Sequence, residues 1–192
     1  MASAAENYRR IRQSLPETVT LVVAAKGRTP AELAEVIEAG AGVIGENYVQ
    51  EARRHREALG TAADRAEWHL IGHLQRNKVK KALLLFDVIQ SVDSLRLGEE
   101  ISKRALQMGK AVEVLVEVNT SGEATKFGVD LERAERFFAT YGHDERVALD
   151  GIHLHIGSPV YAVEPYVQAI TRALELVRRL RERGHDIRSF NM

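Results

Sequence analysis

The sequence of 192 residues contains no cysteine, which excludes a disulfide scaffold, a thiolate metal site and a cysteine nucleophile. It carries no net charge either, since 27 Lys and Arg balance 27 Asp and Glu, and this argues against a protein that holds nucleic acid by bulk positive charge. No stretch approaches the ~18 consecutive apolar residues of a membrane helix, and the N-terminus lacks the apolar core of a secretory signal. The 45% of apolar residues predict one cytoplasmic globular domain.

Apolar runs of strand length alternate with stretches of helical period along the chain. Strands are expected at residues 21–25, 43–44, 68–71, 86–90, 112–118, 152–156 and 187–190. Helices are expected near residues 3–15, 29–40, 48–59, 76–85, 94–108, 130–141 and 163–183, with caps for the fifth helix at 91–94. Repeated βα units imply a parallel sheet with helices outside it. The pattern favours an α/β fold of the (β/α)8 TIM-barrel type that lacks the last βα unit over an open doubly wound sheet.

A capping box and a glycine-rich run flank the helix expected near residues 29–40. The run Thr29-Pro30-Ala31-Glu32 has the form of a capping box, and Gly40 is a plausible helix stop. The run from Gly40 to Gly45 spells GxGxxG, but a dinucleotide site needs a strand before the glycines and a helix after them. The order here is reversed, so a helix end followed by a tight loop is favoured over NAD binding.

Four histidines raise the possibility of a metal site. His153 and His155 share one face of an expected strand, and His69 and His73 offer further imidazoles. A metal-dependent hydrolase built on these histidines is one hypothesis. A His-x-His pair more often consists of one histidine that packs and one that is functional. We therefore predict no metal. The basic run at 76–81 is most simply a solvated helix face, with attraction of phosphate as the alternative.

Lys26 is the candidate reactive residue. It ends the first apolar strand and precedes Gly27. In a barrel, that end of a strand faces the active-site mouth. Apolar walls around a lysine disfavour the ammonium form and leave a nucleophilic amine that reacts with carbonyl groups. Taken alone, a lysine at a strand end more often simply reaches solvent.

Four motifs resemble one known family, the pyridoxal phosphate homeostasis proteins. They are VTLVVAAKGRTPAELAEVIEAGAGVIGENYVQEA, WHLIGHLQRNK, IQSVDSLRL and EVLVEVNTSGEATKFGV, and the likeness covers roughly residues 5–130. Members of that family are single-domain barrels similar to the N-terminal domain of alanine racemase. The family usually has serine before its first-strand lysine, where this chain has Ala25.

The resemblance implies a cofactor, pyridoxal 5′-phosphate (PLP), held as a Schiff base on Lys26. It also implies that Asn47 lies near the cofactor and that His73 lies at the mouth of the third strand. Asn119 and Lys126 fall in the loop after the fifth strand, where each is a candidate for cofactor contact or for a loop hydrogen bond.

Residues 149–192 resemble a related family instead, the diaminopimelate and ornithine decarboxylase barrels. There the histidine of His-Ile-Gly-Ser lies against the cofactor ring and the serine binds its phosphate, which implies those roles for His155 and Ser158. The expected organisation is therefore one PLP-binding barrel domain over residues 1–192, similar to homeostasis proteins over 1–148 and to decarboxylases over 149–192. A natural or engineered chimera is the hypothesis for this mixture.

Both families have a phosphate-binding loop after the seventh strand, and this chain stops at Asn191-Met192. We therefore expect weakened cofactor binding, and either a monomer or self-association through an open barrel edge. The favoured function is PLP binding for cofactor homeostasis or carriage, without established turnover. The alternatives are a fragment of a PLP-dependent decarboxylase or racemase, and a truncated barrel that binds ligand weakly or not at all.

Overall fold

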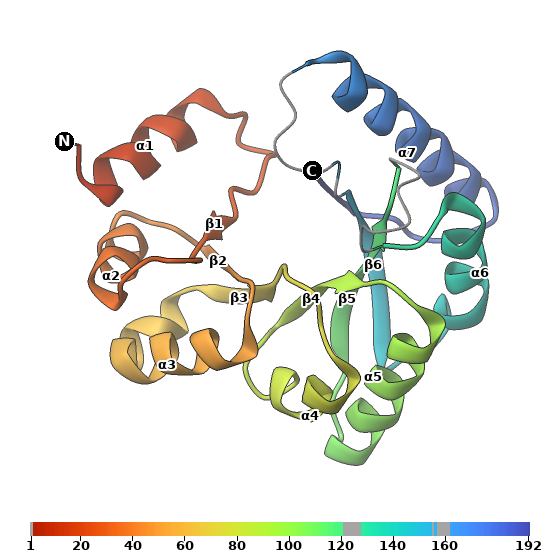
Figure 1. Cartoon of the computed structure of the whole chain (residues 1–192), viewed down its shortest axis with the longest axis horizontal. Coiled ribbons are helices and arrows are strands. Elements are labelled where there is room, and N and C mark those ends of the chain that lie inside the picture. The colour runs from red at the N-terminus through yellow and green to blue at the C-terminus, as the bar shows by residue number, and fades with distance from the viewer. Residues whose placement is uncertain (1, 121–127, 155, 157–161) are drawn as a thin grey trace.

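The computed structural model describes residues 2–120, 128–154, 156 and 162–192 (Figure 1). Within them the strands form one seven-stranded parallel sheet in chain order, from β1 to β7. Figure 1 shows the helices around the outside of this curled sheet. The predicted α/β architecture, an incomplete barrel of the TIM type, is confirmed.

The bounds of the elements follow the predicted alternation. The strands are β1 (Val23–Ala24), β2 (Val43–Glu46), β3 (Glu67–Leu70), β4 (Val88–Val92), β5 (Val112–Val118), β6 (Val147–Leu154) and β7 (Ser189–Asn191). The α-helices are α1 (Ala4–Ser14), α2 (Pro30–Glu38), α3 (Val49–Leu59), α4 (Val79–Ala82), α5 (Leu95–Met108), α6 (Leu131–Tyr141) and α7 (Glu164–Glu182). Two 3₁₀ helices, η1 (Gly60–Arg65) and η2 (Arg76–Lys78), complete the described secondary structure.

Several predicted elements differ from the observed ones in their bounds, and β1 is the shortest strand relative to its prediction, with two paired residues where five were expected. The helix predicted at 76–85 is the short η2 followed by α4, because the chain turns after Ala82 to bring Phe86 into the core. β6 begins at Val147, before the predicted start at 152, because pairing with β5 extends a strand through the polar Asp150. Ser91 and Val92, predicted as helix caps, belong to β4, and the cap of α5 is Ser94.

The core lies between the sheet and the helices. Its largest fully buried side chains come from strands and helices alike and include Trp68, Phe137, Phe138, Ile44, Leu70, Ile89 and Leu176. Burial of a side chain of this size stabilises the fold by about 1.5–3 kcal/mol. In α2 the predicted apolar face of Leu33, Val36 and Ile37 is buried.

Polar contacts inside the curl show that β3, β4, β6 and β7 face one another across its interior, while β1 and β7 do not pair in the described sheet. The Gln90 side chain on β4 donates to His69 Nδ1 on β3 at 2.6 Å and accepts a hydrogen bond from the Asn191 amide on β7. His153 Nδ1 on β6 donates to the Gln90 carbonyl at 3.1 Å. Because β4 is not a neighbour of β6 or β7 in the sheet, these contacts cross the interior of the curl.

The GxGxxG run has the structure of a helix end and a strand. Gly40 follows α2 with a φ of +101°, a conformation that favours glycine. Gly45 lies within β2, where a Cβ would come within 2.8 Å of Val22 Cγ1. The helix-end interpretation is confirmed. Over the described residues, no helix has the length and hydropathy needed to span a membrane.

Candidate functional site

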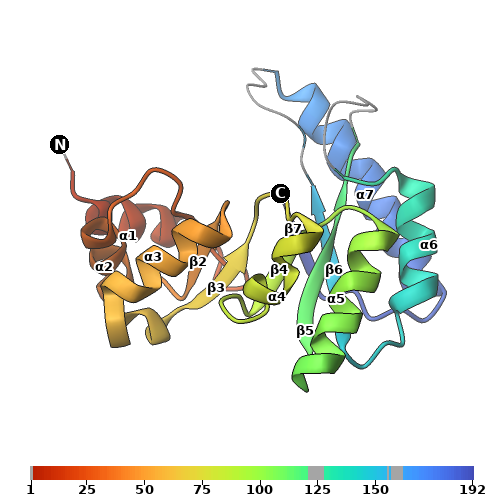
Figure 2. The same cartoon turned by 60° about the horizontal axis from the view of Figure 1, so that its bottom comes forward.

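The predicted site residues that the structure describes follow the carboxyl ends of four strands. Lys26 comes two residues after β1, Asn47 directly after β2, His73 three residues after β3 and Asn119 directly after β5. Because the strands are parallel, their carboxyl ends share one edge of the sheet, and Figure 2 shows the sheet turned relative to Figure 1. The fold therefore brings the four residues to the same edge, as predicted.

Lys26 lies in a tight turn. The Arg28 N–H donates to the Ala25 carbonyl at 2.9 Å, and Gly27 within the turn has a φ of +71°. Ala25 is fully buried, whereas Lys26 is exposed. The structure therefore places Lys26 at the surface, the commoner outcome for a lysine at a strand end, and its reactivity stays a prediction. The strand holds its backbone, and its amine is open to solvent.

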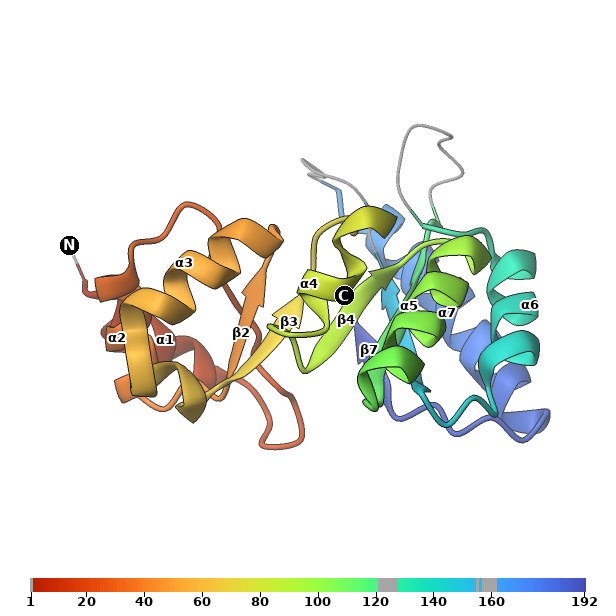
Figure 3. The same cartoon turned by 90° about the horizontal axis from the view of Figure 1, so that it is seen from below.

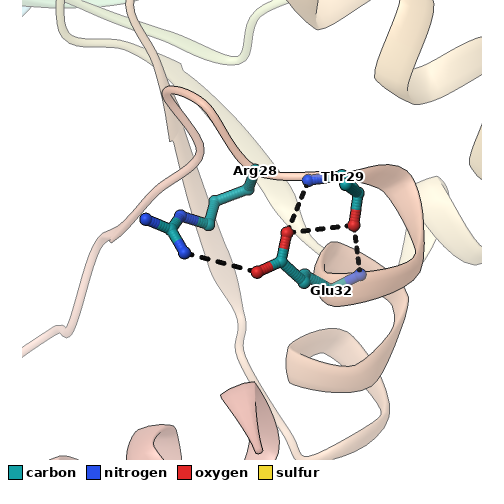
Figure 4. Close-up of polar contacts among 3 residues, drawn as sticks. All are labelled: Arg28, Thr29 and Glu32. Carbon is teal, nitrogen blue, oxygen red and sulfur yellow. Dashed lines mark hydrogen bonds and ion pairs between the residues drawn. The ribbon is translucent and has the colours of Figure 1, made fainter.

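A capping box fixes the chain immediately after this turn (Figure 4). The Glu32 carboxylate accepts from the Thr29 N–H at 2.8 Å and from the Thr29 hydroxyl at 2.9 Å, while Thr29 Oγ1 accepts from the Glu32 N–H at 3.2 Å. Arg28 lies 3.3 Å from the same carboxylate. The hydrogen bond from the Thr29 backbone is the main reason why the pKa of Glu32 is lowered. The predicted cap is confirmed, and it ends the Lys26 turn at a defined position.

Asn47 is half-buried, and the loop after β3 passes directly over its backbone. A Cβ on Gly72 would lie 2.5 Å from the Asn47 carbonyl oxygen, so only glycine allows this approach. The next residue is His73, whose Nδ1 lies 2.9 Å from the Asp93 carboxylate beyond β4. The loops after β2, β3 and β4 are thus joined in one row of contacts.

Glu117 extends this row to β5. It is 6% exposed, and burial raises its pKa to about 7, with the neighbouring Asp93 carboxylate as a second cause. A carboxyl group with this pKa exchanges a proton near neutral pH. The edge therefore carries an amine, carboxamides, an imidazole and a carboxyl group that is readily protonated.

Glu46, the last residue of β2, makes its contact on the helix side of the sheet. It is fully buried, and its Oε1 lies 2.5 Å from His55 Nδ1 on α3. Burial raises the pKa of Glu46, and the His55 imidazole opposes that effect. The contact ties α3 to β2 next to Asn47, so it positions the edge without lining it.

The model of the alanine racemase N-terminal domain family matches residues 1–192. The chain belongs to this family. It is 34% identical over 173 residues to the pyridoxal phosphate homeostasis protein of Aquifex aeolicus, which covers 90% of this chain and 72% of the relative. Against the protein of the same name from Escherichia coli K12, identity is 34% over 140 residues, 71% of this chain and 59% of the relative. The chain thus spans less than two thirds of that relative's length.

A solved member of the family has the same fold. The structure of PipY from Synechococcus elongatus PCC7942, with PLP bound, superimposes with a TM-score of 0.84 at 28% identity, over 97% of this chain and 85% of that one. The predicted resemblance to the homeostasis proteins is confirmed. The roles of the individual site residues and the division of the domain at residue 148 stay predictions.

Three predicted site residues, Lys126, His155 and Ser158, lie outside the described residues. Asn119 is described: its N–H donates to the Val129 carbonyl at 2.9 Å, and Gly128 packs against it with a φ of +103°. Across the described ranges, no three His, Asp or Glu side chains converge as a metal site would require.

The sequence interpretation missed Asp93 and Glu117. Asp93 was assigned to a helix cap, but its carboxylate pairs with His73. Glu117 had a visible signal, because charged residues at 113 and 117 interrupt a run of valines with the even spacing of one strand face. In an incomplete barrel of this family, such a face points into the curl.

Proposed function

We propose that this chain is a PLP-binding protein of cofactor homeostasis or carriage, which holds PLP as a Schiff base on Lys26. The observation that carries the proposal is the position of Lys26. Its exposed amine stands in a glycine turn at the sheet edge that also presents Asn47 and His73. An amine that reaches solvent from a fixed backbone is suited to capture an aldehyde that arrives from solution.

The relatives support this proposal. The family includes PipY, whose structure holds PLP, and proteins named for PLP homeostasis. The likeness in fold covers 97% of this chain and 85% of the PipY chain. The proposal accordingly concerns binding and carriage.

The donor groups at the edge fit PLP. In the proposed bond, Lys26 Nζ joins the aldehyde carbon and the carbonyl oxygen leaves as water. Asn47 and Asn119 provide carboxamides that donate to ring or phosphate oxygens, and His73, held by Asp93, provides an oriented imidazole. When bound, PLP supplies an electrophilic aldehyde and an electron-withdrawing ring.

The remaining parts of the proposal concern the whole chain. We assign residues 1–192 to one PLP-binding domain, in which 1–148 provide Lys26 and 149–192 provide His155 and Ser158 for the ring and the phosphate. We place the protein in the cytoplasm. For its assembly we propose a monomer or self-association through the free edges of β1 and β7, each of which pairs with one neighbour in the described sheet.

The test is to load the protein with PLP, reduce it with borohydride and locate the added mass by peptide mass spectrometry. Wild type should develop a visible absorption band and carry the mass on the peptide that holds Lys26. Lys26→Ala should lose both signals and keep its stability, because the side chain is exposed.

The matched control is Lys103→Ala, which removes another exposed lysine from α5. It should behave as wild type. An added mass that persists in Lys26→Ala, or that is found on another lysine of the wild type, would disprove the assignment of Lys26.

A further inference from the structure

A basic groove lies between α3 and the segment formed by η2 and α4, which are neighbours on the outer side of the sheet (Figure 1). Its volume is about 440 Å³, within the ~300–1,000 Å³ typical of small-molecule sites. The lining residues that matter here are Val49, Arg53, Lys78, Lys81, Leu84 and Leu85. We call this set the basic groove.

The charges of the basic groove are not balanced. Arg53, Lys78 and Lys81 line it, and none of its lining residues is acidic. Within the described residues, Lys78 and Lys81 have no carboxylate partner, and Arg53 has only Glu57 at 3.8 Å, a pair that is exposed on both sides. Such exposed pairs contribute little. Three cations therefore face one cavity, and an anion placed there would interact favourably with all of them.

The other lining groups are apolar or are uncharged donors. Val49 and Leu85 provide apolar lining, and Leu84, which also lines the groove, is 61% exposed. Gln50 and Asn77 add carboxamides that can donate to anionic oxygens. The groove thus combines a cationic part with an apolar part.

The two walls of the basic groove are fixed to each other. Arg56, one turn beyond Arg53 on α3, donates to the Leu85 carbonyl at 3.3 Å and lies over the Trp68 ring at 5.4 Å from its centroid. Trp68 is fully buried and its Nε1 donates to the Ala63 carbonyl at 2.9 Å. The distance between the walls is therefore held by the core, and a ligand would meet a preformed site.

We propose that the basic groove binds a small ligand that joins a di- or triphosphate to an apolar ring, as a nucleoside diphosphate does. The phosphates would meet Arg53, Lys78 and Lys81, and the ring would cover Leu84 and the apolar lining. The ligand's charge matches the three unbalanced cations, and its ring accounts for the exposed leucine. The site is separate from Lys26 and does not depend on PLP binding.

The experiment is calorimetric titration of the full chain with ADP, pyrophosphate and adenosine, at low and at high salt. ADP should bind more tightly than pyrophosphate, and adenosine should not bind measurably. Arg53→Gln/Lys78→Gln/Lys81→Gln should weaken ADP at least about tenfold, which corresponds to 1.4 kcal/mol, and should lose most of the salt dependence. Leu84→Ser should weaken ADP but not pyrophosphate.

The matched control, Lys80→Gln/Arg96→Gln/Lys103→Gln, removes the same charge from exposed positions outside the groove and should bind ADP as wild type does. Lys26→Ala should also bind ADP normally, so that failure of the PLP proposal and failure of this one are distinguishable. Equal ADP binding by wild type and the groove variant would overturn the proposal. So would the absence of measurable ADP binding by wild type.

Discussion

Strand β1 and the pair β5–β6 build very different amounts of sheet. β1 pairs with β2 through two Cα pairs, and its residue Ala24 is exposed. β5 and β6 pair through seven Cα pairs, and every residue of β5 except Glu113 is buried. Figure 2 shows the long strands β5 and β6 beside α5, α6 and α7, and Figure 3 shows these helices at the opposite side of the molecule from α1, α2 and α3.

The region around β1 is accessible to solvent, whereas the strands β5 and β6 are mostly buried. Lys26 follows the short, exposed strand, where a bulky molecule from solution can reach its amine. Glu117 belongs to the long, buried strand, where its environment shifts its pKa. Reactive groups on loops positioned by a stable scaffold are common in enzymes and binding proteins. Substitutions at the two ends should accordingly change different properties, stability at β5–β6 and cofactor capture at β1.

The largest loss of stability is expected from Gly151→Ala in β6. A Cβ at this position would overlap the Ser189 carbonyl oxygen of β7, and because the overlapping atoms are backbone, no side-chain rotation can relieve the clash. The variant should lower the free energy of unfolding by at least about 3 kcal/mol, measured by urea denaturation. The substitution would therefore destabilise the extensively paired region from β5 to β7.

The control for that substitution is Gly42→Ala, just before β2. Nothing lies within 4 Å of a Cβ at Gly42, and its φ is not positive. The change in stability should stay within about 0.5 kcal/mol. Similar losses at the two glycines would show that the β5–β7 region is not more tightly packed than the β1–β2 region.

An effect that is no larger, and of the opposite sign, is expected from Glu117→Gln. Burial raises the pKa of Glu117 from 4.5 to about 7, so the folded state binds a proton more tightly than the unfolded state. The stability that this proton contributes is complete below pH 4.5 and is lost as the pH rises through 7. Glutamine cannot ionise, so the variant should match wild type in acid and exceed it by roughly 3 kcal/mol at pH 8.

Denaturation curves at several pH values would measure this difference. Glu145→Gln, which removes an exposed carboxylate, is the control and should leave the pH dependence unchanged. A constant offset between wild type and Glu117→Gln at all pH values would contradict the role of burial at β5.

The sequence predicted elements better than it predicted their environments. The capping box at Thr29, the stop at Gly40 and the whole of β5 were predicted from local patterns, because caps and strand alternation depend on neighbouring residues. The exposure of Lys26 could not be decided from local patterns, because it depends on how far β1 pairs with the strand beside it, which is a property of the assembled sheet.

The same reason explains the missed partners in the site. Asp93 is twenty residues from His73, and its carboxylate is as suitable for a helix cap as for an ion pair, so local reasoning could not choose between them. The contact of Gln90 with Asn191 joins residues 101 positions apart and exists only because the sheet curls. Such pairs follow from topology and register, which the sequence of one chain specifies only indirectly.

The smallest effect on stability is expected from Thr29→Ala, at the accessible end. The substitution removes the hydroxyl that caps α2 and that bonds to Glu32, directly after the Lys26 turn (Figure 4). It should lower the free energy of unfolding by about 1 kcal/mol. Because the cap also ends the turn, PLP titration followed by absorbance should show an affinity reduced by up to about fivefold.

Ser3→Ala is the matched control, because Ser3 forms the same kind of capping box with Glu6 at the start of α1. The loss of stability should be similar, and PLP affinity should not change, since α1 does not carry the turn. If both variants lose affinity equally, the effect comes from general loosening of the N-terminal region. If only Thr29→Ala loses affinity, the short strand β1 depends on this cap to hold the turn that carries Lys26.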